Sequence, residues 1–306
     1  MKFAKPAINH AAQLHKLKSR GLLVADDSEA IELLLNIGYY RLSGYAFPFL
    51  SPPNRTSFKP GSSLEQIIRI YECDRELRIL LMDVIERIEV SLRSRIVNQT
   101  CQPWGAHWFM DAARFHWRFN HTQFVGNLER ELGIRHDPVT RQRILPTAHA
   151  ETFIEHYYTK YGDPYLPPFW MTAEVLSLGT LSKLYTGIGD ARMKAEIAQP
   201  FGVPAKIFSG WLHSLSHFRN TCAHHCRLWN RIFSISPKRS HKHQGIMHSP
   251  DRLEGHLVVL ADVLDVTSPG HSFRVNLKGL LKRFPEIDPS ALGFPTHWET
   301  LPFWKS

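Results

Sequence analysis

Long apolar runs are missing from this 306-residue sequence. Its most apolar stretch, residues 79–92, is broken every three or four residues by Asp, Glu or Arg, whereas a membrane-spanning helix needs about 20 predominantly apolar residues. The first fifteen residues hold a proline and several polar side chains where a signal peptide would need an unbroken apolar stretch. The sequence therefore predicts a cytoplasmic protein that does not associate with membranes.

Cysteine is also rare, with four residues in the whole chain. This number is too small for the disulfide framework of a small secreted fold and fits a reducing compartment. The 18 glycines and 20 prolines exclude collagen-like and low-complexity chains, and 43% hydrophobic residues are enough for a buried core. The length fits one large domain or two at most.

Acidic residues are outnumbered, since 37 Lys and Arg face 28 Asp and Glu and leave a net charge of +9. Eighteen histidines can add positive charge where the local pH or a polyanion favours it. This balance favours a polyanionic partner such as nucleic acid, although charge alone reports neither fold nor chemistry.

Helical periodicity dominates the chain. Apolar residues recur through residues 62–100 at a spacing that keeps one face of a long helix apolar. Period-2 alternation is absent over any useful length, so we expect few strands and an all-α fold. Shorter helices are expected at residues 11–18, 28–35, 121–132, 149–161, 170–185, 193–201, 205–233, 252–263 and 272–284.

Three segments organise the chain. Residues 1–60 form an N-terminal segment with a helical hairpin and an aromatic stretch, ended by the proline-containing loop that begins at Ser51. Residues 61–235 form the helical core, and residues 236–306 add a basic loop and a C-terminal helical extension. We expect these segments to pack as one compact unit.

The expected helix over residues 205–233 carries the most informative pattern. On a helical wheel its polar and basic side chains gather within roughly 60° of Asn220. They belong to His213, His217, His224, Arg227 and Arg231. The opposite side collects Trp211, Leu215, Phe218, Cys222, Trp229 and Phe233.

His224 is the stronger candidate for chemistry, because it shares a face with Asn220 one turn earlier, whereas His225 lies near the edge of the apolar face. The long side chain of Arg219 can swing round the helix towards His224. Metal-free RNA cleavage needs a base near neutral pKa for the 2′-hydroxyl and a planar cation for the phosphate. Imidazole and guanidinium meet these needs, and Asn220 would orient the imidazole or contact the substrate.

Three other interpretations of this segment stay open. A zinc site is suggested by His213 and His217 with Cys222, His225 and Cys226 nearby, but on the wheel the cysteines face away from the histidine stripe. A cysteine nucleophile would need an exposed electropositive setting, whereas both cysteines lie on or beside the apolar face. In the third interpretation, His224 and Arg219 only tie the helix to its neighbours through hydrogen bonds.

The run RNTCAH at residues 219–224 resembles the R-x4-6-H signature of HEPN-domain ribonucleases. More specifically, the chain resembles the Abi-like family of bacterial abortive-infection proteins, of the AbiD and AbiF type. The resemblance is carried by GYYRLSGY at residues 38–45, YECDRELR at 71–78, IEVSLR at 88–93, and the segment 219–231 that ends in LWNR. The two additional histidines, His213 and His217, are not required by the family pattern.

The resemblance implies a HEPN-type helical bundle and RNA cleavage without metal or other cofactor. The products would carry 2′,3′-cyclic phosphate and 5′-hydroxyl ends, and the composite site would lie across a homodimer. Arg219 would contact the phosphate, His224 would be the general acid or base, and Asn220 would orient the reacting groups. A cognate noncoding RNA that restrains or guides the protein is the implied partner, as in a toxin–antitoxin phage-defence system.

Residues outside that signature are expected to support the site. Asp74 falls within the apolar stripe of the long helix, where a carboxylate needs a cation, and we expect it to pair with Arg219 or with Arg78. Glu89 and Arg93 stand four residues apart on the same helix and are expected to pair. His225 is included as a supporting residue beside His224.

RNA would be bound by aromatic and basic side chains near the site. The candidates are Tyr39, Tyr40, Arg41, His217, Arg227 and Arg231, together with the basic loops at residues 135–143 and 238–243. For the tyrosine cluster, packing against the bundle is the alternative. For the whole protein, the alternatives to a ribonuclease are a module that clamps a structured noncoding RNA without cutting it and a protein-binding scaffold.

Overall fold

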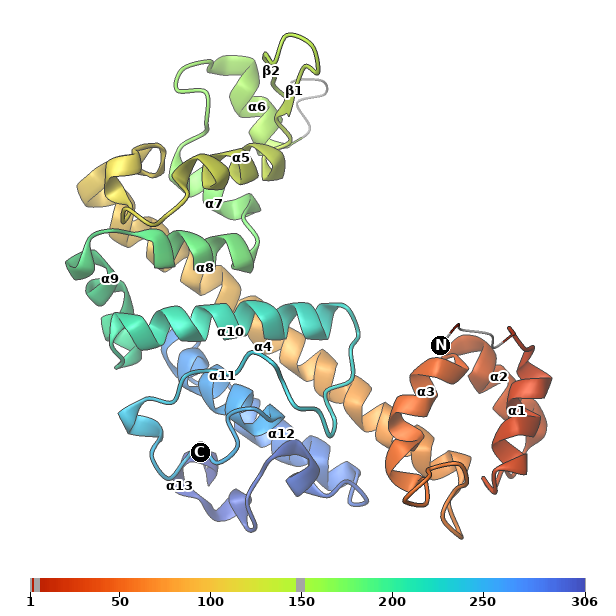
Figure 1. Ribbon diagram of the computed structural model, residues 1–306. Coiled ribbons are helices and arrows are strands. Elements are labelled where there is room, and N and C mark those ends of the chain that lie inside the picture. The colour runs from red at the N-terminus through yellow and green to blue at the C-terminus, as the bar shows by residue number, and fades with distance from the viewer. Residues whose placement is uncertain (1, 3–5, 147–151, 306) are drawn as a thin grey trace.

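The computed structural model describes residues 2, 6–146 and 152–305. This part of the chain contains thirteen α-helices, several short 3-10 helices and a single two-stranded hairpin. The predicted all-α class is therefore confirmed (Figure 1). None of the helices in these residues is both long and apolar enough to span a bilayer.

Helix α4, Leu64–Trp104, is the axis of the molecule and confirms the long helix expected from the periodicity. Its 41 residues extend for about 60 Å. A capping box between Ser63 and Gln66 fixes its start, and Gly105 with φ of 86° ends it. Elements from every part of the chain pack along α4 (Figure 1).

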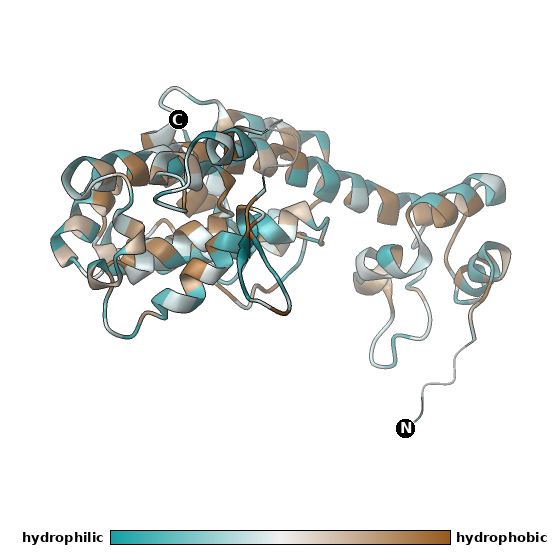
Figure 2. Cartoon of the chain, turned by 90° about the horizontal axis from the view of Figure 1, so that it is seen from above, coloured by the Kyte–Doolittle hydropathy of each residue, from teal (hydrophilic) through white to brown (hydrophobic). Residues whose placement is uncertain are grey.

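The N-terminal segment packs around the first turns of α4. Helices α1, His10–Ser19, and α2, Asp27–Asn36, form the predicted hairpin, capped by Asn9 and Asp26. The aromatic stretch, expected only to lie between glycines, is itself a helix, α3, Tyr39–Ala46, which packs on α4. Seen from above, these three helices stand apart from the rest of the bundle at one end of α4 (Figure 2).

The opposite end of α4 carries the middle of the sequence. It comprises α5, His121–Glu131, the hairpin β1, Arg135–His136, and β2, Arg143–Ile144, then α6, Phe153–Lys160, α7, Phe169–Val175, α8, Leu178–Gly187, and α9, Ala191–Ala198. The single helix expected over residues 170–185 is wrong, because the chain is extended at Leu176 and Ser177, whose hydroxyl caps α8. The basic loop expected at 135–143 is a hairpin, and part of the helix expected from residue 149 lies outside the described residues.

Helix α10, Ala205–Ala223, crosses α4 and packs against α8. Helix α11, Leu253–Thr267, lies against both α4 and α10 and is buried on nearly all sides, so residues after 236 contribute to the core (Figure 1). Helix α12, Phe273–Arg283, then packs on α4. The remaining short elements are η1 Phe47–Phe49, η2 Trp108–Met110, η3 Ala112–Arg114, η4 Gln199–Phe201, η5 His241–His243, η6 Pro289–Leu292, η7 Trp298–Thr300 and α13 Pro302–Lys305.

Candidate active site at the end of α10

One face of α10 is a polar stripe. His213, His217 and Asn220 are exposed along it, while the apolar side, from Phe208 to Cys222, is buried. The expected division of this helix into two faces therefore holds as far as the helix extends. The rings of His213 and His217 lie 4.8 Å apart at 75°. Burial, and then the charge of His217, lowers the pKa of His213.

Helix α10 ends at Ala223, well before the predicted end at residue 233. The amides of His225 and Cys226 donate to the carbonyls of Cys222 and Thr221, at 3.0 Å each, which is the hydrogen-bond pattern of a Schellman motif. His225 takes the left-handed conformation of that motif, with φ of 56°. The placement of Arg227 and Arg231 on the same helical face as His224, and of Trp229 and Phe233 on the opposite face, is therefore wrong, because the chain beyond Ala223 is not helical.

Arg219 is placed by a carboxylate from α4. Its Nε lies 3.6 Å from Oε2 of Glu89, and its side chain is 36% exposed. The other oxygen of Glu89 pairs with Arg93 at 3.1 Å, as expected, and Arg93 also donates to the carbonyl of Leu176. Glu89 thus holds the guanidinium of Arg219 at the surface, where it stays accessible to an anion.

Arg219, Asn220 and His224 gather at the C-terminal end of α10. Nη1 of Arg219 donates to Oδ1 of Asn220 at 3.4 Å. His224 is the C-cap residue, exposed, and its amide donates to the carbonyl of Asn220 at 2.9 Å. A guanidinium, an amide and an imidazole are thus presented to solvent within one and a half turns.

Asp74 is the buried anchor beneath this end of the helix. Its carboxylate is inaccessible and pairs with Arg78, so the Arg78 alternative is confirmed and the Arg219 alternative is wrong. The amides of Leu228 and Trp229 donate to it at 3.0 and 2.6 Å. The hydroxyl of Tyr45 donates to it at 2.7 Å.

Burial raises the pKa of Asp74, and the charge of Arg78 and the hydrogen bonds from Tyr45 and the loop amides oppose that rise. Every hydrogen-bond partner of this carboxylate is a donor, and such donors stabilise a buried carboxylate. Asp74 therefore fastens the loop after α10 to both α3 and α4.

Other basic side chains in this region fasten the same loop. Arg41 of α3 donates to the carbonyl of His225 at 2.6 Å, and Arg227 donates to the carbonyl of Gly44. Arg231 donates to the carbonyl of Arg227 at 3.3 Å. His225 contributes a backbone carbonyl to this network. These contacts attach α3 to the loop after α10.

Two tyrosines of α3 lie in different environments. Tyr39 is half-buried, with the ammonium of Lys16 5.7 Å from its ring. Tyr40 is 91% exposed and precedes Arg41, the residue that contacts His225. Tyr40 therefore offers an exposed aromatic ring on α3, the helix that contacts the loop after α10, and Tyr39 does not.

The alternative chemistries find little support. In the part of the chain that the structure describes, no three His, Cys, Asp or Glu side chains come together as a metal site would require. Cys222 is buried, and burial raises the pKa of its thiol to about 12, so it stays protonated.

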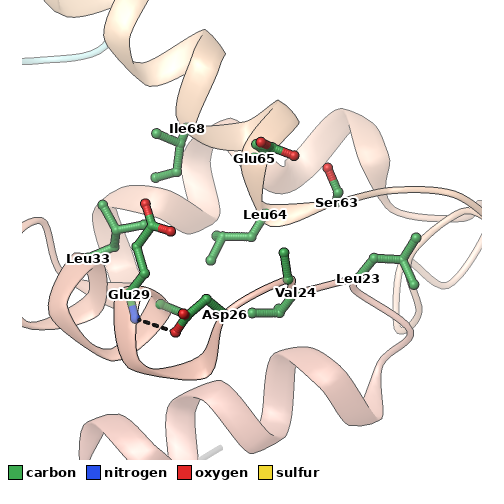
Figure 3. Close-up of a pocket in the computed structure, with 11 residues that line it drawn as sticks. Leu23, Val24, Asp26, Glu29, Leu33, Ser63, Leu64, Glu65 and Ile68 are labelled. Atoms are coloured by element: carbon green, nitrogen blue, oxygen red, sulfur yellow. Dashed lines mark hydrogen bonds between the residues drawn. The ribbon is translucent and has the colours of Figure 1, made fainter.

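A cavity of about 380 Å³ lies elsewhere, between α2 and the start of α4 (Figure 3). It is lined by apolar side chains such as Leu33 and Ile68, and its polar rim includes the helix caps Asp26 and Ser63. Asp26 already accepts from the amides of Ser28 and Glu29. None of the predicted site residues lines this cavity.

Sequence reasoning missed two features of the site. The aromatic pattern around Tyr45 gave no indication that its hydroxyl binds Asp74, 29 residues away. The contact between Glu89 and Arg219 was also missed. The only sequence signal for the first contact was an acidic residue, Asp74, within the apolar stripe of α4.

The sequence profile of the Abi-like protein family matches residues 32–230. This span begins within α2, ends in the loop after α10, and covers more than half of the chain. The chain belongs to the Abi-like protein family. Membership supports a role in abortive infection, a form of defence against phage. Searches of curated proteins and of solved structures found no match to this Abi-like protein.

Proposed function

We propose that this Abi-like protein is a metal-independent endoribonuclease of the HEPN type, acting in a bacterial abortive-infection or toxin–antitoxin system. The observation that supports the proposal is the cluster at the end of α10, where Arg219, Asn220 and His224 face solvent and Glu89 holds the guanidinium. The net charge of +9 favours RNA as the polyanionic substrate.

In the reaction, the imidazole of His224 takes the proton of a ribose 2′-hydroxyl. The 2′-oxygen attacks the adjacent phosphorus and the bond to the 5′-oxygen breaks, which leaves a 2′,3′-cyclic phosphate and a 5′-hydroxyl. Arg219 donates hydrogen bonds to the non-bridging oxygens as negative charge builds on them. Asn220, already in contact with Arg219, orients the phosphate.

A homodimer would complete this chemistry, since the departing 5′-oxygen needs a proton from a second acid. Each chain brings one His224 to the exposed end of α10. Two copies that meet at this surface would supply one imidazole as the base and the other as the acid. Tyr40, exposed on α3, would stack on an unpaired base.

A cognate noncoding RNA is the proposed regulatory partner. Such an RNA would occupy the surface formed by α3, the loop after α10 and the polar stripe of α10. It would restrain cleavage or guide it towards target RNA.

The deciding experiment incubates purified protein with RNA in EDTA and analyses the ends that form. Wild type is expected to leave 2′,3′-cyclic phosphate ends, and Arg219→Ala and His224→Ala should reduce cleavage by about 10²–10⁴-fold. His15→Gln, which changes an exposed histidine of α1, is the matched control and should cleave normally. Absence of cleavage by wild type at any concentration would refute the proposal.

The exposed Tyr40 and the polar stripe also suit the second candidate, a module that binds a structured RNA without cutting it. In that case the same alanine variants would weaken binding and reduce its salt dependence, and no new RNA ends would appear.

A further inference from the structure

Trp117 lies on the turn between η3 and α5, and its side chain is 85% exposed. Tryptophan is a large side chain that is usually well buried. Its neighbours in the same aromatic run behave differently, because the ring of Phe115 is buried and stacks on the ring of Phe119 at 4.7 Å and 10°. The turn therefore directs two rings inwards and one ring outwards.

Two backbone hydrogen bonds hold the segment that leads into Trp117. The amide of His116 donates to the carbonyl of Gly187 at 3.0 Å, and the amide of Gly189 donates to the carbonyl of Arg114 at 2.8 Å. These bonds attach the turn to the end of α8 and the start of α9.

The two glycines allow this close approach. A Cβ atom on Gly187 would lie 2.5 Å from a ring carbon of Phe119, and one on Gly189 would lie 3.0 Å from the backbone carbon of Phe115. Any larger residue would push the turn away. The turn that carries Trp117 is therefore closely packed against the end of α8 and the α8–α9 turn.

Arg118 makes this surface cationic. Its guanidinium lies 4.5 Å from the centre of the Trp117 ring. Among the residues that the structure describes, Arg118 has no carboxylate partner, whereas Arg114 pairs with Asp111 at 3.7 Å. An aromatic ring and an uncompensated guanidinium are thus held together at the surface.

This combination fits an unpaired nucleobase with its phosphate. Bases stack on exposed aromatic rings, and arginine adds a cation for the phosphate and for the ring face. A docking surface for a protein would need a contiguous apolar patch. The residues next to Trp117 on the exposed turn, Arg118 and Asn120, are polar instead.

We propose that Trp117 and Arg118 form a base-stacking platform for single-stranded RNA. That the bound polymer is RNA rests on the proposed function. The platform contacts the α8–α9 turn, and α9 leads to the N-terminal end of α10 (Figure 1). Arg219 and His224 lie at the other end of this 19-residue helix, about 28 Å long. The platform therefore binds a part of the strand several nucleotides away from the bond that is cut.

The test measures binding of a fluorescently labelled, uridine-rich single strand of about 15 nucleotides to the Arg219→Ala protein, with and without a second change. Trp117→Ala should weaken binding by about 5- to 100-fold, the worth of one stacked base. Trp117→Phe should retain most of the affinity, and Trp117→Leu should behave like alanine, because leucine keeps apolar contact and removes the ring. Trp170→Ala, at a second exposed tryptophan, is the matched control.

An abasic strand of the same length separates stacking from charge, and it should bind equally well to the protein that keeps Trp117 and to the Trp117→Ala variant. Unchanged affinity of the uridine-rich strand for Trp117→Ala would overturn the proposal. Full affinity in Trp117→Leu would also overturn it, since the contact would then be merely apolar. An equal loss of affinity in Trp170→Ala would overturn it too, as would an equal effect of Trp117→Ala on the abasic strand. If wild type binds RNA through Trp117 but never cleaves it, the ribonuclease proposal is refuted and the platform proposal stands.

Discussion

The amide of Trp229 donates a 2.6 Å hydrogen bond to the carboxylate of Asp74, a residue 155 positions earlier in the chain. The neighbouring amide of Leu228 binds the same carboxylate, and Arg78 neutralises it. A single buried side chain of α4 thus determines where the loop after α10 lies. Because His224 begins this loop, its position depends on a residue of α4 that is distant in sequence from the helix that carries Arg219.

The Asp74→Asn change should destabilise the protein by about 3–5 kcal/mol, since it leaves Arg78 buried without a counter-charge. One carboxylate oxygen becomes an NH2 donor that faces donors on every side, so either the loop amides or Tyr45 and Arg78 lose an acceptor. Chemical denaturation measures the free energy, and hydrogen exchange at the amides of Leu228 and Trp229 should become faster relative to the rest of the core.

A second variant separates charge from loop attachment. Adding Arg78→Met to Asp74→Asn removes the unpaired charge and should recover part of the stability, while the exchange of the two amides stays fast. Recovery of slow exchange in the double variant would show that Asp74 does not hold the loop.

The sequence predicts most helices of this fold and much less of its site. The apolar stripe of α4 and the caps Asp26 and Ser63 are local signals, so those helices could be predicted from spacing alone. The end of α10 was missed because its left-handed position is occupied by histidine, where glycine would have marked a helix end. The pairs of Asp74 with Arg78 and of Glu89 with Arg93 follow from their four-residue spacing. The contacts of Asp74 with the loop after α10 and of Glu89 with Arg219 join distant segments, so no local pattern could have revealed them.

His225 should tolerate glycine and reject β-branched residues. Its φ of 56° suits glycine, whereas valine in this region costs about 1–2 kcal/mol. His225→Gly should therefore match the wild type in stability and retain cleavage, because Arg41 binds only the backbone carbonyl at this position. His225→Val should unfold at lower denaturant.

The same pair of variants tests which histidine acts in the reaction. Cleavage that survives His225→Gly and is lost in His224→Ala places the chemistry at His224. The reverse result would assign the imidazole to His225 and contradict the proposed site.

Glu89→Gln should lower the turnover number about tenfold or more and leave KM nearly unchanged. The carboxylate positions Arg219 through a 3.6 Å contact, and a misplaced phosphate-binding group slows the chemical step. Steady-state cleavage assays separate the two constants. Glu86→Gln, at an exposed position of the same helix, is the matched control. A rise in KM at constant turnover would mean that Glu89 acts in substrate binding instead.

His256 should make the protein sensitive to acid. It is buried in α11 between the rings of Phe218 and Phe233, each 4.6 Å away. Neither ring nitrogen has a hydrogen-bond partner among the residues that the structure describes. Burial lowers the pKa of His256 from 6.5 to about 3, so the folded protein keeps it neutral. The unfolded chain binds a proton below pH 6.5 and the folded chain does not. Stability is therefore complete above pH 6.5 and is lost by about 1.4 kcal/mol per unit as the pH falls towards 3.

Replacing this imidazole with an apolar side chain should remove its contribution to the pH dependence. Between pH 6.5 and pH 5, wild type should lose about 2 kcal/mol more than His256→Leu in urea unfolding, because about 1.5 pH units separate the two conditions. The comparison uses the difference in slope, so it does not depend on how well leucine fits the core. His15→Gln, which changes an exposed histidine, should follow the wild type. Identical slopes for wild type and His256→Leu would mean that His256 is protonated, or reached by water, in the folded protein. In that case the core around Phe218, the residue before Arg219, would be less tightly packed in solution than the ring contacts of His256 indicate.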